Sequence, residues 1–155
     1  MSKVTLTTEL PISAATASAL ARKPAMIAFV LSPYLRAYRL EVVPEPIEVG
    51  TQGSARLWWL GVIPSWIHHL IVVRLDATEI YTREHGGPVR TWNHRLTFEA
   101  LDDHSCRYID EIETDDGLKG APTRLFIRLM FRHRHRRWRT LANILAVEEA
   151  GWDRI

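Results

Sequence analysis

The stretch "TWNHRLTFEALDDHSCRYIDEIE", residues 91–113, has the pattern of two β-strands joined by a polar turn. Apolar and aromatic residues alternate with polar ones on both sides of "LDDHS", as in strands that bury only one face. On the second strand we expect the set beginning at Tyr108 to face inward, because the other set carries Glu111 and Glu113. The predicted inward set is Trp92, His94, Leu96, Phe98, Tyr108, Asp110 and Ile112.

The polar turn also predicts a register between the two strands. If it pairs Phe98 with Tyr108, His94 and Asp110 become diagonal neighbours on one face of the sheet. An inward carboxylate beside an inward imidazole leaves three interpretations open. The pair is a polar contact that fixes the register, a ligand contact, or a general acid–base pair.

A second hairpin is predicted in "LWWLGVIPSWIHHLIVV", residues 57–73, which carries no charged side chain. The run is shorter than the ~20 apolar residues of a transmembrane helix, so we predict no membrane span. Gly61 and Pro64 within it argue against a helix as well, and Pro64–Ser65 predicts the turn of the hairpin.

Charged residues beside this hairpin predict its faces. With Arg56, Arg74 and Asp76 in water, alternation directs Leu57, Trp59, Ile63, His69, Ile71, Val73 and Leu75 inward. The opposite face would then be an exposed apolar patch, which we interpret as a homodimer contact. The patch consists of Trp58, Leu60, Val62, Leu70 and Val72. A local bulge that reverses the faces, or a helix that covers them, is the alternative.

The other elements complete an α+β order. "VTLTTEL", "AYRLEVV" and "TEIYTRE" have strand composition. Two short helices are predicted in residues 13–31, with Ser13 as N-cap and Pro24 as the break. A long helix runs from Pro122 to about Val147. We predict a single domain over 1–147, in which a curved antiparallel sheet of about seven strands packs against the long helix, and a tail over 148–155.

Composition and charge limit the class of protein. The 155 residues are 46% hydrophobic and 25% charged, as in an ordinary globular domain. A single cysteine, Cys106, and an amino terminus without a signal-type apolar run predict a cytoplasmic protein. Residues 99–116 hold eight acidic side chains and residues 122–139 hold seven arginines. Such blocks neutralise each other, remain solvated, or mark an interaction surface.

The arginine-rich helix is predicted to be amphipathic. One arc holds Arg124, Arg128, Arg132, His135, Arg136 and Arg139, and the opposite stripe holds Phe126, Met130, Leu141 and Leu145. His133, Arg134 and Arg137 fall within or beside the apolar stripe. These arginines need a carboxylate such as Asp110 or an acidic ligand group, or they lie at the rim with their heads in water. Nucleic-acid binding by the basic arc is a further alternative, although no recognition module accompanies it.

Motifs for other chemistry are missing from the sequence. There is no glycine-rich phosphate loop and no nucleophile elbow. His133 and His135 are two residues apart on a helix and diverge, so we predict no metal site and no cofactor. Cys106 has no activating neighbours in the sequence, which favours a bystander thiol.

The segment "GPVRTWNHRLTFEALDDHSCRYIDEIE", residues 87–113, resembles the G-P-x-x-x-W-x-H-x-x-x-F-E segment and following D-E-I-E strand of SRPBCC proteins. These are the START/Bet v 1-like and polyketide cyclase-like proteins. "GVIPSWIHHLIV" resembles their preceding hairpin and "FRHRHRRWRTL" their terminal helix. The resemblance implies a helix-grip fold, with a deep cavity between sheet and helix that binds or transforms hydrophobic small molecules. It implies no catalytic set, and "PAMIAFVLSPYLRAY" departs from the W-x-P-type segment of the cyclase-like members.

These observations predict a pocket protein for an apolar ligand such as a lipid, polyketide or isoprenoid. The predicted ligand-binding residues are Trp59, His69, Ile71, Trp92, His94, Leu96, Phe98, Tyr108, Asp110, Ile112, Phe126, Met130, Arg134 and Arg137. The main alternative is a cyclase or dehydratase in which His94 acts as base and Asp110 holds its tautomer.

Overall fold

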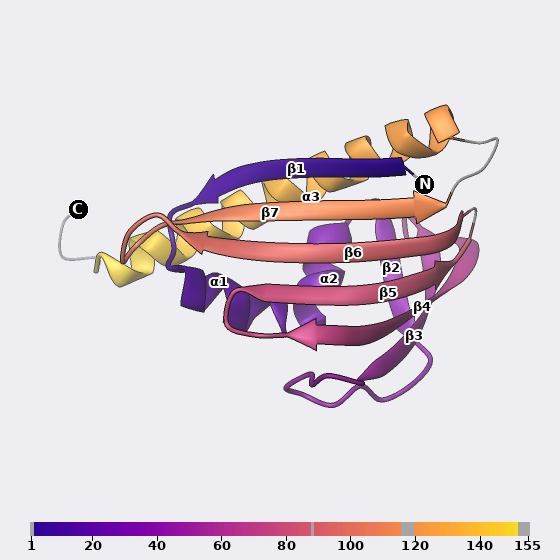
Figure 1. Ribbon diagram of the computed structural model, residues 1–155, viewed down its shortest axis with the longest axis horizontal. Coiled ribbons are helices and arrows are strands. Elements are labelled where there is room, and N and C mark those ends of the chain that lie inside the picture. The colour runs from indigo at the N-terminus through magenta and orange to yellow at the C-terminus, as the bar shows by residue number, and fades with distance from the viewer. Residues whose placement is uncertain (1, 88, 116–119, 152–155) are drawn as a thin grey trace.

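The structure, a computed structural model, describes residues 2–87, 89–115 and 120–151. These residues form seven strands and three helices (Figure 1). In chain order they are β1 (Ser2–Leu10), α1 (Ala14–Ala21), α2 (Pro24–Leu31), β2 (Leu35–Arg39), β3 (Gln52–Trp59), β4 (Ile63–Leu75), β5 (Glu79–Gly86), β6 (Val89–Ala100), β7 (Cys106–Asp115) and α3 (Gly120–Glu149). Part of the predicted tail, residues 152–155, lies outside the described residues.

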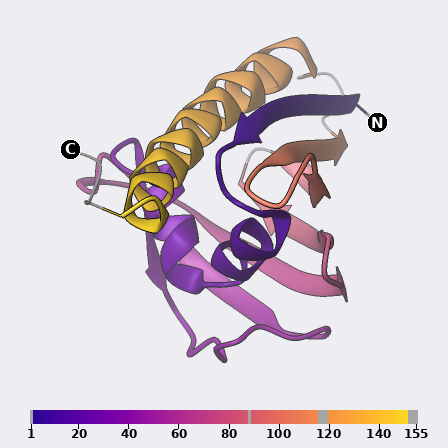
Figure 2. The same ribbon diagram turned by 90° about the vertical axis from the view of Figure 1, so that its left-hand side faces the viewer.

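The seven strands form one antiparallel sheet in the order β1-β7-β6-β5-β4-β3-β2. The sheet bends around α3, which packs along β1, and α2 contacts both α3 and β2 (Figures 1 and 2). This is the predicted α+β helix-grip arrangement, with two short helices after the first strand. Within the described ranges, no single helix is long and apolar enough to cross a bilayer, and α1 and α2 pass that test only as a pair bent by 90°.

Local signals explain the two short helices. The Ser13 hydroxyl accepts a hydrogen bond from the backbone N–H of Thr16 at 3.1 Å, which confirms the predicted N-cap of α1. Pro24 stands at the first position of α2, where a missing N–H costs nothing. The chain therefore turns sharply between the two helices instead of continuing as one.

The β6–β7 hairpin has the predicted register. Phe98 pairs with Tyr108, Leu96 with Asp110, and His94 therefore lies diagonally from Asp110. The predicted inward residues are all buried: Trp92, His94, Leu96, Phe98, Tyr108, Asp110 and Ile112. Alternation alone predicted these faces correctly, because the hydrogen-bonded pairing of β6 with β7 has no bulge from end to end.

The β3–β4 hairpin turns earlier than predicted. The turn lies at residues 60–62, and Pro64 pairs with Trp58 near the start of β4. Leu60 and Gly61 have φ values of 51° and 74°, as a tight turn with two left-handed residues requires. The Arg36 side chain covers Gly61, since a Cβ there would come within 2.7 Å of Arg36 Cδ. Ile63, predicted inward, is 57% exposed.

The predicted faces of β4 were wrong over most of its length. The register with β5 shifts between Val72 and Arg74, which makes Val73 an extra residue that is 38% exposed. This bulge reverses the alternation, because two consecutive residues occupy the outer side. Leu75 is inward as predicted, but Leu70 and Val72 face the interior, while His69 and Ile71 face outward.

Candidate functional site

A cavity of about 330 Å³ lies between the concave face of the sheet and the helices α2 and α3. Its volume is near the lower end of the ~300–1,000 Å³ range of small-molecule sites. Most of the wall is apolar and comes from α2, α3 and the strands β2 to β6. Among the apolar wall residues are Met26, Val30, Leu57, Leu70, Val72, Leu96, Met130 and Phe131.

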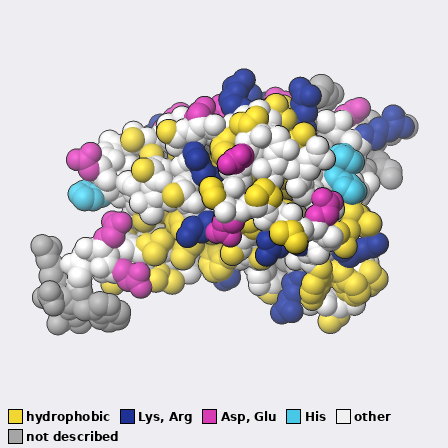
Figure 3. All heavy atoms as spheres, turned by 90° about the horizontal axis from the view of Figure 1, so that it is seen from below, with side chains coloured by type: hydrophobic (Ala, Val, Ile, Leu, Met, Phe, Trp, Pro, Cys, Tyr) yellow, Lys and Arg dark blue, Asp and Glu magenta, His cyan; other side chains and the backbone are white. Residues whose placement is uncertain are grey.

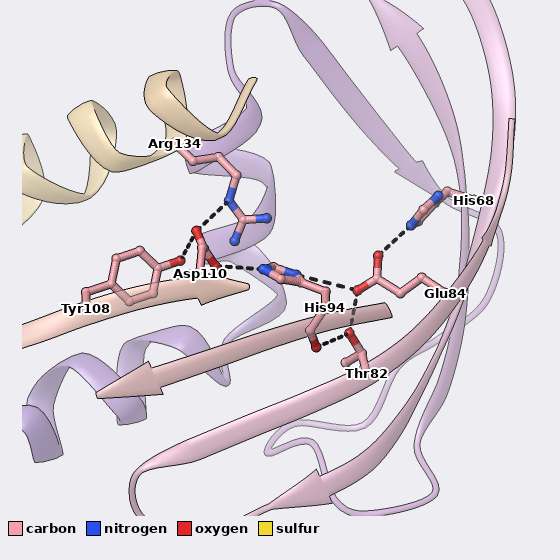
Figure 4. A network of polar contacts seen from close by, with 7 residues as sticks. All are labelled: His68, Thr82, Glu84, His94, Tyr108, Asp110 and Arg134. Carbon is pink, nitrogen blue, oxygen red and sulfur yellow. Dashed lines mark hydrogen bonds and ion pairs between the residues drawn. The ribbon is translucent and has the colours of Figure 1, made fainter. Parts of the chain in front are cut away.

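A line of polar side chains crosses the sheet beside this cavity (Figure 4). His68 on β4 contacts Glu84 on β5 through Nε2 and Oε2, which are 2.7 Å apart. The other oxygen of Glu84, Oε1, lies 3.7 Å from Nδ1 of His94 on β6. Nε2 of His94 lies 2.6 Å from Oδ1 of Asp110 on β7. We refer to His68, Glu84, His94 and Asp110 as the polar chain.

Asp110 ends the polar chain beneath α3 and is fully buried. Its Oδ2 accepts a hydrogen bond from the hydroxyl of Tyr108 at 2.7 Å and lies 3.1 Å from Nε2 of His135. Nε of Arg134 is 4.0 Å from the same oxygen. Burial and the Asp110 charge raise the pKa of Tyr108 well above its usual value, so Tyr108 remains a hydroxyl donor. His135, predicted on the solvated arc, is therefore buried and bonded to the interior.

The two carboxylates of the polar chain are held in their ionised form. Burial opposes ionisation of both carboxylates, but hydrogen bonds from His68 and His94 hold the pKa of Glu84 well below its usual range. The charges of Arg134 and His94 hold the pKa of Asp110 low against burial in the same way. In turn, although burial disfavours both cations, the Asp110 carboxylate raises the pKa values of His94 and Arg134.

The contacts of the His94 ring argue against a role as general base. One ring nitrogen faces Asp110 and the other faces Glu84, so both are next to carboxylate oxygens. A general base needs a neutral ring with a nitrogen directed at its substrate. The arrangement instead favours an imidazolium between two carboxylates, which is a structural and electrostatic role.

Six of the predicted ligand-binding residues line the cavity. They are Trp92, His94, Leu96, Phe126, Met130 and Arg134. Four others lie in the filled core or at its edge behind this wall: Phe98, Tyr108, Asp110 and Ile112. Asp110 is not itself a wall residue, but it contacts two residues that are, His94 and Arg134.

The remaining four predicted residues lie elsewhere. Trp59 packs edge-on against Trp66 and Phe126, with ring centroids 6.0 and 5.9 Å away. Arg137 lies over the Phe29 ring and donates to the Phe29 carbonyl oxygen at 3.3 Å. His69 and Ile71 are on the outer face of the sheet because of the β4 bulge, and His69 stacks on His85 at 4.8 Å.

Several wall residues were missed by the sequence reasoning. They are Trp66, His68, Leu70, Val72, Thr82, Glu84 and Trp138. In β5 a signal was available, because buried Ile80 begins an alternation that continues to Thr82 and Glu84. Thr82 donates from Oγ1 to Glu84 Oε1 at 2.5 Å, which supports the carboxylate from its own strand.

No metal centre is formed by the part of the chain that the structure describes, since no group of three or more His, Cys, Asp or Glu side chains converges on one point there. His69 and His94 lie on opposite faces of the sheet. Cys106 is fully buried, and burial raises the pKa of its thiol. A buried thiol of raised pKa is a poor nucleophile.

The curved sheet, the long terminal helix and the cavity between them make up a START-like helix-grip fold. Residues 9–141 match the model of a family described as "Domain of unknown function (DUF8410)", and the chain belongs to this family. No curated protein matches the chain.

Solved structures share the fold at low sequence identity. The START superfamily protein from Mycobacterium smegmatis has a TM-score of 0.71 and 14% identity, over 92% of this chain and 98% of that chain. Protein CV1439 from Chromobacterium violaceum has a TM-score of 0.73 and 12% identity, over 91% and 97%. A protein from Arthrobacter aurescens has a TM-score of 0.76 and 8% identity, over 91% and 86%. These likenesses establish the fold alone.

Proposed function

We propose that this protein binds a small, largely apolar molecule in the cavity, with the polar group of the molecule against the polar chain and Arg134. The carrying observation is a cavity of about 330 Å³ whose apolar wall is interrupted on one side by His68, Glu84, His94 and Arg134. A mostly apolar cavity with a few convergent polar groups is the usual composition of a small-molecule site.

The energetics of the cavity support a ligand. A bound apolar molecule leaves water for the apolar wall, at roughly 25 cal/mol per Å² of apolar surface buried. It also stabilises the native state by mass action, because it binds the folded chain and not the unfolded one.

Binding is better supported than catalysis. The cyclase or dehydratase alternative needs His94 as a free base, but both of its ring nitrogens face carboxylates. The polar chain therefore suits recognition of a polar group and a fixed sheet register.

Native mass spectrometry of freshly purified protein, followed by solvent extraction, tests the proposal. We expect a retained molecule of low polarity. Val72→Phe should displace it, because Val72 is a cavity-wall residue that is 1% exposed. Ile71→Phe is the matched control, because Ile71 lies next to it on the outer face. Equal retention by both variants, or no uptake of any apolar compound by the protein, would contradict the proposal.

We propose a homodimer contact that involves fewer residues than the sequence predicted. Leu70 and Val72 are interior, but Leu60 and Val62 are 58% and 71% exposed at the hairpin tip, and Trp58 meets Tyr38 edge-on at 6.0 Å. Hydrophobic side chains gather in patches on the face seen from below, with Lys and Arg between them (Figure 3). We expect Leu60→Asp with Val62→Asp to lower the sedimentation mass from dimer to monomer; a monomeric parent protein would contradict this contact.

A further inference from the structure

Three cationic side chains belong to the cavity wall where it meets solvent. They are Arg22 at the end of α1, Lys23 directly before α2, and Arg39 at the end of β2. Lys23 and Arg39 are exposed and Arg22 is half-buried, in contrast to the buried inner wall. We refer to Arg22, Lys23 and Arg39 as the rim cations.

Arg39 belongs to the inward face of its strand. Leu35, Ala37 and Arg39 alternate along β2, and all three are wall residues. Ala55, which pairs with Arg39 on β3, is a wall residue as well. Arg39 therefore continues the inward face of β2 at its exposed end and does not belong to the outer face of the sheet.

The rim cations have no carboxylate partner among the residues that the structure describes. Nη2 of Arg22 donates to the carbonyl oxygen of Asp76 at 2.5 Å and to the Ser18 hydroxyl at 3.4 Å. Both of these acceptors are uncharged. In the described wall the one acidic residue is Glu84, which contacts His68 and His94 instead.

The loop between β2 and β3 adds no negative charge to the wall. Its acidic residues Glu41, Glu45 and Glu48 are not among the wall residues, and the Glu41 carboxylate accepts a hydrogen bond from the Ser54 hydroxyl. The loop contributes apolar side chains to the wall, which include Val43 and Ile47. The positive charge of the rim is therefore not compensated from this side.

The charges at the inner end of the cavity, by contrast, are paired with one another. Arg134 lies 4.0 Å from Asp110, and the ring nitrogens of His94 lie 2.6 Å from Asp110 and 3.7 Å from Glu84 (Figure 4). Two cationic groups thus face two carboxylates, and a further buried anion would compete with those carboxylates. The surplus of positive charge in the wall lies at the rim.

We propose that the ligand is an anionic amphiphile, whose apolar body lies in the cavity and whose acidic head group lies among the rim cations. This inference rests on the proposed function, and it adds a charged group at the open end of the molecule to the inner polar contact proposed there. An anion at the rim keeps part of its hydration, so it avoids the cost of full burial while the rim cations attract it. The inference selects apolar acids over alcohols and amines with the same apolar chain.

A matched series of probes tests the inference on the wild-type protein by calorimetry at neutral pH and low salt. Octanoate, 1-octanol and octylamine share one chain length and differ in the charge of the head group. We expect octanoate to bind about three- to tenfold tighter than 1-octanol, as for a few partly exposed ion pairs, and octylamine to bind more weakly than both. Hydration alone would favour 1-octanol, because a carboxylate is more strongly hydrated than a hydroxyl. Added salt should reduce the preference for octanoate, since it screens exposed charges.

Two double variants assign the preference to the rim. In Lys23→Gln with Arg39→Gln, the affinity ratio of octanoate to 1-octanol should fall to one or below. Arg36→Gln with Arg83→Gln removes the same net charge from exposed positions outside the wall, so it should keep the wild-type ratio. Arg22 is left unchanged because it also bonds the Asp76 carbonyl. Thermal unfolding of each variant confirms that the comparison is made on folded protein.

A third variant tests whether the chain of the acid enters the cavity. Val72→Phe should weaken the binding of octanoate and 1-octanol alike, because Val72 is a buried wall residue. Unchanged binding of octanoate together with weakened binding of 1-octanol would mean that the acid binds at the surface, and it would overturn the inference.

The outcomes separate this inference from the proposed function. Tighter binding of octanoate that depends on Lys23 and Arg39 supports the inference. Equal or tighter binding of 1-octanol or octylamine, or a preference that survives in Lys23→Gln with Arg39→Gln, overturns it and leaves the proposed function standing. No binding of any probe, together with no retained molecule after purification, overturns both.

Discussion

The two hairpins of the sheet differ in regularity, and they contribute differently to the filled core and to the cavity wall. β6 and β7 pair without interruption from Thr91 and Asp115 to Ala100 and Cys106. β4 breaks register with both neighbours, once against β3 and once against β5. Bulges increase the local bend and twist of a strand.

Packing differs as well. The regular hairpin supplies fully buried core residues, Phe98, Tyr108 and Ile112, in addition to wall residues on β6. On the bulged hairpin, the inward residues Leu70 and Val72 face the cavity. We infer that the irregular strand bends away from α3 and leaves the hollow, while the regular hairpin holds Asp110 and His94 in a fixed geometry.

The largest effect is expected at the regular hairpin. Asp110→Asn removes the charge that faces His94 and Arg134, so it leaves buried cations without compensation. We expect a loss of about 3–5 kcal/mol in the free energy of unfolding, measured by denaturant titration. Glu111→Gln is the control, because Glu111 faces outward and pairs with Lys3 at 2.7 Å. Its loss should stay below ~1 kcal/mol, and similar losses at both positions would contradict the inward role of Asp110.

The same kind of comparison on the bulged hairpin should give a smaller effect. It tests the observed faces of β4, with Val72 inward and Ile71 outward. Val72→Thr keeps the shape but places a hydroxyl in the apolar wall, which costs about 1–3 kcal/mol if it finds no partner. Ile71→Thr on the outer face should cost less than ~0.5 kcal/mol. If the order of these two losses were reversed, β4 would have its unbulged alternation and the bulge at Val73 would be absent in solution.

This contrast explains how much the sequence could predict. Alternation is a local signal, so it predicted the β6–β7 faces, the register and the His94–Asp110 contact. A bulge depends on how β4 pairs with β5, and nothing in "IHHLIVVRL" marks Val73 as the extra residue. An error of one position then moved His69 and Ile71 to the wrong face.

The helix shows a second limit of local reasoning. A 100° projection placed His135 with the exposed Arg132 and Arg136, although His135 is 7% exposed and contacts Asp110. The buried arc of α3 is wide because the sheet curves around it (Figure 2). The width of the buried arc depends on that curvature, which cannot be deduced from the helical periodicity of the sequence. The inward position of Glu84, by contrast, could have been predicted from the alternation in β5.

The pH dependence of the free energy of unfolding gives a further test of the regular hairpin. The Asp110 carboxylate raises the folded-state pKa of His94, so the stabilisation by its charge is complete below the unfolded value of about 6.5 and is lost as pH rises through the folded value. Glu84 and Asp110 have lowered pKa values, so their contribution is constant at neutral pH and is lost only in acid.

We therefore expect the free energy of unfolding to decline above neutrality in the wild type and to decline less in His94→Asn. His68 contacts Glu84 and His135 contacts Asp110 in both proteins, so the difference between the two curves isolates His94. His69→Asn, on the outer face, should give the wild-type slope. Parallel curves for His94→Asn and the wild type would show that His94 is not held as an imidazolium.

The smallest effect is expected at the tip of the bulged hairpin. Gly61 has a φ of 74° and lies under Arg36, so Gly61→Ala adds both a left-handed alanine and a contact of 2.7 Å with a flexible side chain. We expect a loss of about 1 kcal/mol in the free energy of unfolding, mostly from the backbone. Leu60→Gly changes the neighbouring residue, at φ 51°, in the opposite sense and should cost less or stabilise. Because the tip lies outside the cavity wall, neither change should alter ligand binding, whereas an altered affinity would mean that the turn controls the bend of β4.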